Sequence, residues 1–261
     1  MKYHLDTIPV WEAMEHPGEC PLCQVRDKIE GEYISVFLGG ALMDPDIRVE
    51  TNAKGFCPAH FQMLYDGGNR LGLGLMSHTR LIELRETIAK DAEAMARAIH
   101  ADQGRSMTRR AGDALKGGGQ TAKALRQAQT HLAAKHHCAI CERMEQNMAR
   151  YLFTFLHLYK TEPRFVEAMR GSNGFCIPHY QQLLAMAGEQ LSGKVQRAFL
   201  LDLTELQVAQ LERLEGEIKW FTEKFDHRNT DAPWGTSRDA LQRTFKKLVG
   251  RSPEKEPPKK N

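Results

Sequence analysis

The sequence predicts an all-α protein built from two related helical halves that share a pseudo-two-fold arrangement. Three observations lead to this prediction. A segment that begins at Cys20 returns at Cys138, and apolar residues after each copy recur at helical spacings. Neither copy contains a run of alternating β-branched residues with a hairpin turn, so a sheet-based architecture fits poorly.

The internal repeat is clearest around the cysteines. The segment CPLCQVRDKIEGEYISVFLGG starts at Cys20, and its counterpart CAICERMEQNMARYLFTFLHL starts at Cys138. After a one-residue insertion, GFCPAHF at Gly55 corresponds to GFCIPHY at Gly174, and all six cysteines lie within the correspondence. Self-similarity of this kind indicates duplication of one supersecondary unit. We therefore expect a first helical repeat over residues 1–101 and a second over residues 121–225.

Apolar residues within each repeat recur at spacings of three and four, which is typical of amphipathic helices. One helix of each repeat is expected to begin at its CxxC pair, with the apolar stripes Ile29, Tyr33, Val36, Phe37 and Met144, Met148, Tyr151, Phe155. Long helices are expected after each CxxH pair, with the stripes Leu81, Leu84, Ile88, Ala92, Met95, Ile99 and Leu211, Leu214, Ile218, Phe221, Phe225.

The remaining segments have the composition of connections and ends. Residues 102–120 carry several arginines and five glycines, which predict a Gly/Arg-rich linker. Residues 226–250 are expected to form an aromatic turn and a final helix that packs back on the body with Trp234 as its anchor. A partner-binding surface is the alternative for that segment. Residues 251–261 are rich in proline and charge, and a disordered tail is expected there.

Each repeat supplies a complete set of four metal donors. A CxxC pair is followed, after 33 or 34 residues, by a Cys-x2-His pair. Three thiolates and one imidazole suit tetrahedral Zn²⁺, and four protein ligands leave no position for a reactive water, which favours a structural ion. We expect each repeat to close its own site, the first from Cys20, Cys23, Cys57 and His60 and the second from Cys138, Cys141, Cys176 and His179.

The repeat also separates expected ligands from other histidines. His136 and His137 stand beside Cys138, but their counterparts in the first copy are Gly18 and Glu19. A shared metal site would keep its donors in both copies. His136 and His137 are therefore not expected to be ligands.

An iron–sulfur cluster is the alternative occupant of a Cys3His set, and two clusters in one chain would indicate electron transfer. Zinc is favoured because paired x2 spacings with thiolate and imidazole donors are typical of zinc sites. Two zinc ions per chain are expected.

Charge and hydropathy bear on compartment and partners. A net charge of +3 does not by itself indicate nucleic acid, although the basic residues in 105–123 and the pair Lys246 and Lys247 keep nucleic-acid binding as a second alternative. Charged residues interrupt the N-terminal segment, and no stretch approaches the roughly 18 apolar residues of a membrane span. A cytoplasmic protein without membrane insertion is expected, and its thiols would be kept reduced.

No standard nucleotide-binding, hydrolase or metalloprotease signature occurs in the sequence, so no catalytic or cofactor-binding residue is predicted. This weighs against an enzyme, and an enzyme with an unrecognised site stays open as the alternative. The expected function is a zinc-stabilised protein-interaction or adaptor module whose partner is a protein. The sequence does not specify that partner or an oligomeric state.

Taken together, CPLC and CAIC, the two GFCxxH motifs and DHRNTDAPWGTSRDAL near the end resemble an uncharacterised bacterial family. This family is a domain of unknown function found mainly in anaerobic Firmicutes, and its members are sometimes labelled ABC-transporter substrate-binding proteins. The resemblance covers nearly the whole chain and implies no catalytic residues. The transporter label implies an export signal, which the N-terminal segment does not show.

Overall fold

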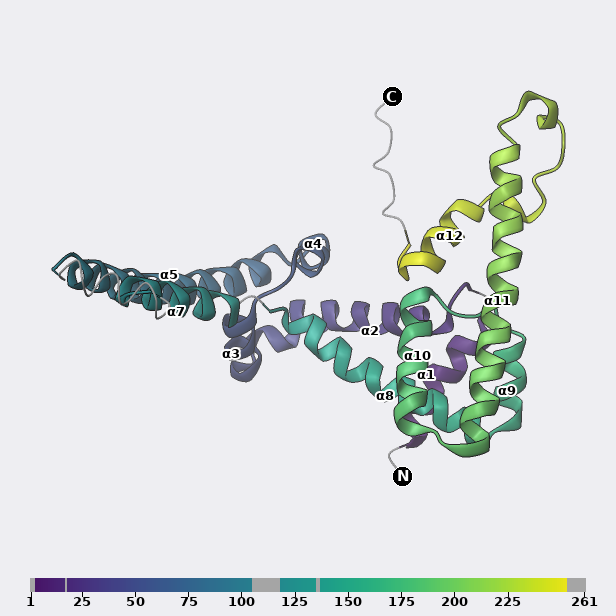
Figure 1. The fold of residues 1–261 in the computed structure, drawn as a ribbon, viewed down its shortest axis with the longest axis horizontal. Coiled ribbons are helices and arrows are strands. Elements are labelled where there is room, and N and C mark those ends of the chain that lie inside the picture. Colours follow the sequence, from purple (N-terminus) through teal and green to yellow (C-terminus); the bar gives the residue numbers. More distant parts are fainter. Residues whose placement is uncertain (1–2, 17, 105–117, 135–136, 253–261) are drawn as a thin grey trace. The chain divides into compact units, whose positions relative to one another are not determined.

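The computed structural model describes residues 3–16, 18–104, 118–134 and 137–252 (Figure 1). These residues form helices joined by short turns, and no strand occurs among them. The expected all-α fold class is thereby confirmed. None of the described helices combines the length and the apolar character that a membrane span requires. Most of the expected linker and of the expected tail falls outside the described residues.

The chain divides into two compact units. Unit 1 comprises Met1–Ile29 and Gln146–Asn261, and unit 2 comprises Glu30–Glu145. Helices α2 (Pro21–Leu38) and α8 (Ala139–Thr161) each begin in one unit and end in the other. The units therefore differ from the repeats expected at residues 1–101 and 121–225, because each unit combines the start or end of one repeat with part of the other.

Unit 1 is built around the second half of α8. Its other elements are α1 (Tyr3–Glu15), the first half of α2, α9 (Pro163–Arg170), α10 (Ile177–Gln190), α11 (Gly193–Glu223), the short turns η2 (His227–Asn229) and η3 (Gly235–Ser237), and α12 (Ala240–Val249). The ring of Phe155 meets Phe165 and Phe175 edge to face, with centroids 4.8 and 5.5 Å apart. All three rings are fully buried, so the residue before Cys176 belongs to the core of this unit.

Unit 2 contains the second half of α2 and the first turns of α8. Its other elements are η1 (Gly40–Met43), α3 (Pro45–Lys54), α4 (Pro58–Asp66), α5 (Arg70–Gln103) and α7 (Gln120–Ala134). The long helices α5 and α7 run side by side (Figure 1). The core includes Phe37 near the end of α2, Leu64 on α4, Met76 on α5, and Ile140 and Met144 on α8. The metal-motif helices α4 and α8 are thus anchored by one apolar cluster.

The helices at the CxxC pairs begin where the sequence predicts them to begin. Helices α2 and α8 begin directly after Cys20 and Cys138, which confirms the expected helix at each CxxC pair. The long helices α5 and α11 are also present, but each is preceded by a shorter helix, α4 or α10, that carries the histidine of the CxxH pair. Helix α4 has 9 residues and α10 has 14, so the two copies differ in length between the histidine and the long helix.

The segment after α11 packs back on unit 1, as expected. Trp220 Nε1 donates to the carbonyl oxygen of Pro233 at 3.1 Å, and the ring of Trp234 lies 5.8 Å from that of Phe221. The ammonium of Lys224 lies over the Trp234 ring. Helix α12 then packs against α10 and α11, and this contact places it beside the metal motifs of unit 1.

Candidate metal centres

The structure brings all eight expected donors into two clusters. One consists of Cys20, Cys23, Cys176 and His179, and the other consists of Cys57, His60, Cys138 and Cys141. In each cluster the four ligand atoms lie within 4.8 Å of one another. The expected pairing within each repeat is therefore wrong: each cluster takes its CxxC pair from one copy and its CxxH pair from the other.

The length of the helix that follows each CxxC pair accounts for this exchange. Helix α2 has 18 residues, which corresponds to about 27 Å of helix at 1.5 Å per residue. It begins in unit 1 and ends in unit 2, so the chain reaches Cys57 only after leaving the unit that contains Cys23. Helix α8, with 23 residues, separates Cys141 from Cys176 in the same way.

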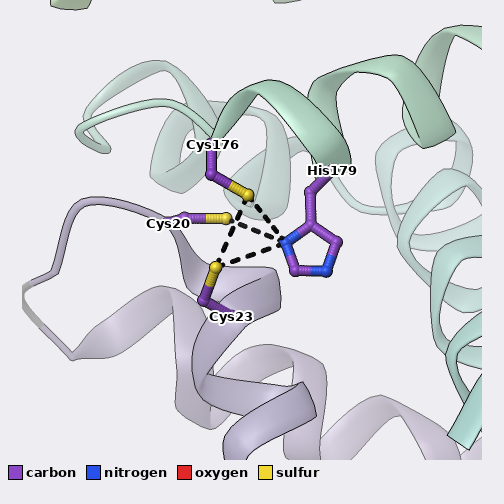
Figure 2. Close-up of side chains that lie close together, drawn as sticks. All are labelled: Cys20, Cys23, Cys176 and His179. Atoms are coloured by element: carbon purple, nitrogen blue, oxygen red, sulfur yellow. Dashed lines mark hydrogen bonds between the residues drawn. The ribbon is translucent and has the colours of Figure 1, made fainter. Parts of the chain in front are cut away.

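The cluster in unit 1 is compact and buried (Figure 2). His179 Nδ1 lies 3.4 Å from the sulfurs of Cys20 and Cys23 and 3.1 Å from that of Cys176. The sulfurs of Cys23 and Cys176 are 3.5 Å apart. Figure 2 shows all four side chains pointing toward a common centre. The donor atom that the histidine presents is therefore Nδ1.

The cluster in unit 2 has the same construction. His60 Nδ1 lies 3.3 Å from each of the sulfurs of Cys57, Cys138 and Cys141. The sulfurs of Cys57 and Cys141 are 3.8 Å apart. Cys57 and Cys141 are partly exposed, whereas all four residues of the unit 1 cluster are buried. The unit 2 cluster is thus the more accessible of the two.

Helix starts supply the ligands in both clusters. Cys57 and Cys176 directly precede α4 and α10 in extended conformation, and Cys20 and Cys138 directly precede α2 and α8. Each cluster therefore joins the N-termini of two helices. Helix N-termini favour negative charge, so their dipoles stabilise the thiolates that a metal requires.

A glycine precedes each Phe-Cys pair and permits the sharp entry to the helix. Gly55 and Gly174 have φ angles of 76° and 71°, in the left-handed region that side chains other than glycine rarely adopt. A long side chain from the second helix after each loop, α11 or α5, fixes that loop. Gln207 accepts from the amide of Phe175 and donates to its carbonyl oxygen, at 3.0 and 2.9 Å. Arg80 donates to the carbonyl oxygen of Ala53 at 2.9 Å.

A buried carboxylate orients the histidine of unit 2. His60 Nε2 lies 2.9 Å from Glu30 Oε1, and both side chains are almost fully buried. When a metal ion is bound, a hydrogen bond from Nε2–H to this carboxylate would leave Nδ1 as the donor atom that faces the sulfurs. Burial acts to lower the pKa of His60, but the hydrogen bonds to Cys138 and Glu30 raise it to about 10. The Glu30 carboxylate therefore makes the imidazole more basic, and sequence reasoning did not identify it.

The Glu30→Gln substitution is expected to weaken metal binding at the unit 2 cluster roughly 10- to 100-fold, because the amide removes the charge that orients and polarises His60. Competition with a chromophoric zinc chelator measures the change. Glu32→Gln is the matched control, since Glu32 is exposed on the same helix. Equal affinities of the two variants would contradict this role for Glu30.

A network of buried charges fixes the motif loops in unit 1. Lys247 on α12 is fully buried and donates to the carbonyl oxygens of Glu19 and Asn173 at 2.7 and 2.5 Å. Its ammonium also lies 3.1 Å from the Glu19 carboxylate, which pairs in turn with Arg213 at 2.8 Å. Burial lowers the pKa of Lys247. Glu19 precedes Cys20 and Asn173 precedes Gly174. The ammonium of Lys247 therefore binds both loops that lead into the cysteine motifs of this cluster.

Nothing in the sequence pattern indicated this role for Lys247. Adjacent lysines on a helix are typical of a solvated basic face, and the pair with Lys246 supported the hypothesis of nucleic-acid binding. Because Lys247 is buried and bonded to Glu19 and Asn173, it does not contribute to an exposed basic surface.

The thiols influence one another strongly. Hydrogen bonds with Cys20 and Cys23 lower the pKa of Cys176 to about 3, and hydrogen bonds with Cys176 and Cys20 raise that of Cys23. In unit 2, burial acts to raise the pKa of Cys138, but the hydrogen bond with His60 lowers it to about 6. Burial and the neighbouring Cys138 raise the pKa of Cys141 to about 12. A divalent metal ion fits this donor set, because its charge would offset the repulsion between three thiolates at such short distances.

The donor sets also limit the chemistry of the two centres. Four protein ligands complete a tetrahedron, which leaves no coordination position for water or substrate. Each cluster thus has the composition of a closed site that can hold one metal ion and join two helix starts.

The model of a family of unknown function, DUF6062, matches residues 1–255 of the chain. The chain belongs to this family. The match covers both clusters and α12, and it confirms the resemblance to an uncharacterised family that the paired motifs indicated. Neither a curated protein nor a solved structure matches the chain.

Proposed function

We propose that each cluster holds one zinc ion in a structural role, and that the protein is a zinc-stabilised interaction or adaptor module. The convergence of four protein donors in each of two clusters is the observation that carries the proposal. A closed donor set supports a structural ion, because a catalytic zinc keeps one position open for water.

The spacing of the donors supports a single ion at each site. Zn–S bonds of about 2.3 Å place the sulfurs of a tetrahedral site about 3.8 Å apart. The measured sulfur–sulfur distances of 3.5 and 3.8 Å fit that geometry. An iron–sulfur cluster inserts several iron and sulfide ions between its ligands and requires wider spacing. The distances therefore favour zinc over the iron–sulfur alternative.

Metal analysis with an absorption spectrum tests the identity of the ion. Protein purified anaerobically without added metal is expected to contain two zinc ions per chain and to be colourless, because Zn²⁺ has a filled d shell. Stoichiometric iron with visible charge-transfer absorption would replace this proposal with an electron-transfer function.

Exposed apolar side chains on the two longest helices support the interaction role. On α5, Leu71, Leu81 and Ile88 are 75%, 64% and 51% exposed. On α11, Leu201 and Val208 are 60% and 55% exposed. Apolar residues along an accessible helix are a common means of binding a partner helix. The short helices α4 and α10, each held at its start by a metal ion, would support the long helices that directly follow them.

Affinity capture followed by mass spectrometry tests the interaction role. The zinc-loaded chain is expected to retain a protein partner in stoichiometric amount, and the Cys57→Ser and Cys176→Ser variants show which metal-supported unit is required. Capture of nucleic acid alone would contradict the interaction role. The absence of any protein that stays bound to the intact chain after washing would contradict it as well.

A further inference from the structure

The two donor clusters differ in how well the chain covers their sulfurs. In unit 1, Cys20, Cys23 and Cys176 are all fully buried. The end of α12 contributes to this cover, since the carbonyl oxygen of Gly250 lies 3.2 Å from the sulfur of Cys23. The position of a Cβ on Gly250 lies only 3.1 Å from the sulfur of Cys176. The sulfurs of unit 1 are therefore shielded from small molecules in solution.

The sulfurs of unit 2 are less completely covered. Cys138 is buried, but Cys57 and Cys141 are both partly exposed. Cys57 directly precedes α4, Cys141 lies in the first turn of α8, and their sulfurs are 3.8 Å apart. A small oxidant that reaches this cluster therefore meets two neighbouring sulfurs from two different helix starts.

Contacts outside the donor set also hold these two helix starts together. The amide of Ala139 donates to the carbonyl oxygen of Gly55 at 3.0 Å. The ammonium of Lys54 lies 2.8 Å from the carboxylate of Glu142. Lys54 and Gly55 stand just before the exposed cysteine of α4, and Glu142 directly follows that of α8. These contacts would keep the two sulfurs close to each other during a reaction that removes them from the metal.

We propose that Cys57 and Cys141 are a peroxide-sensitive pair, and that their oxidation to a disulfide opens the metal site of unit 2 while the covered site of unit 1 stays intact. This inference rests on the proposed zinc sites and adds their regulation. Cysteines that respond to peroxides are typically accessible thiolates with a second cysteine close by. Metal binding keeps the sulfurs in the thiolate form, and the structure supplies the access and the neighbour.

Hydrogen peroxide is the oxidant in this reaction. One thiolate of the pair attacks a peroxide oxygen, the O–O bond breaks and hydroxide leaves, which gives a sulfenic acid. The other thiolate attacks that sulfur, the S–S bond forms and a second hydroxide leaves. The two sulfurs together lose two electrons, and these reduce the peroxide to two hydroxide ions. Only Cys138 and His60 then remain of the four donors, and two donors do not complete a tetrahedral site.

Release of zinc from the intact chain during exposure to hydrogen peroxide tests the proposal. With a chromophoric chelator as the reporter, one ion per chain is expected to be released at least about tenfold faster than the other, because oxidation follows the exposure of the thiolate. Mass spectrometry of the alkylated and digested protein should show that a disulfide between Cys57 and Cys141 forms during the fast phase. A phosphine reductant with added zinc should restore two ions per chain.

Cys176→Ser and Cys141→Ser are matched variants, because each retains the complete donor set of one unit. The first is expected to lose its remaining ion at the fast rate, and the second at the slow rate. Equal rates of release from the two sites, or a fast phase without the disulfide between Cys57 and Cys141, would overturn the proposal and leave the structural role of zinc in place. An intact chain that held no zinc before the reaction would overturn both.

Discussion

Removal of both metal ions is expected to abolish the cooperative thermal transition of the protein and to reduce its helical content. The two donor clusters join segments that are distant along the chain, for example Cys23 with Cys176, 153 residues apart. Apparent binding free energies of structural zinc are on the order of 10 kcal/mol, which is comparable to the whole stability of a typical domain, about 5 to 15 kcal/mol. The binding free energy lost with two ions is therefore larger than the stability that the apolar cores are expected to supply without them.

Far-UV circular dichroism during heating, with and without a strong zinc chelator, measures this effect. Readdition of zinc after chelation is the control, and it should restore both the helical signal and the transition. An unchanged melting curve of protein shown by metal analysis to be metal-free would contradict a structural role for the ions.

Loss of a single ligand is expected to destabilise only the unit that contains its cluster. The three tryptophans of the chain are Trp11, Trp220 and Trp234, and all of them lie in unit 1. Their fluorescence therefore reports on that unit. Cys176→Ser is expected to lower the tryptophan-monitored transition by roughly 10 °C or more, because several kcal/mol are lost and each changes the midpoint by about 2 to 4 °C.

The cysteines of unit 2 provide the matched control. Cys141→Ser removes a sulfur of the other cluster and should leave the tryptophan-monitored transition near its original temperature, while a loss of helical signal reports on unit 2. If Cys141→Ser and Cys176→Ser lowered the tryptophan transition equally, and Cys23→Ser did not, the donors would pair within repeats instead.

The sequence was sufficient to predict the donors and the helices around them. Each CxxC and CxxH pair occurs twice at matched positions, which predicted the eight donors that the structure gathers into two clusters. Helix starts at the CxxC pairs followed from apolar residues at spacings of three and four. These features are local, because each depends on residues within a few turns of helix.

The pairing of the clusters could not be predicted from the same local features. Two CxxC pairs and two CxxH pairs can combine in two ways, and both give complete Cys3His sets. The decisive property is the uninterrupted length of α2 and α8. Because each helix ends in a different unit from the one in which it begins, each CxxC pair and the next CxxH pair along the chain lie in different units.

The supporting carboxylates were also beyond prediction. Glu30 lies on α2 at a position typical of any solvated helix face, and only the tertiary packing brings it to 2.9 Å from His60. Glu19 and Lys247 are 228 residues apart and show no motif that connects them. Buried ion pairs of this kind depend on how helices meet, and a single sequence does not specify that.

The central claim is that each cluster combines the CxxC pair of one copy with the CxxH pair of the other. The zinc content of two double variants tests it most directly. Cys20→Ser combined with Cys176→Ser damages one cluster twice, so this variant is expected to retain one ion per chain. Cys20→Ser combined with Cys57→Ser damages both clusters, and it is expected to retain none. The opposite result, one ion in the Cys20 and Cys57 variant and none in the Cys20 and Cys176 variant, would show that each repeat closes its own site and would contradict the structure.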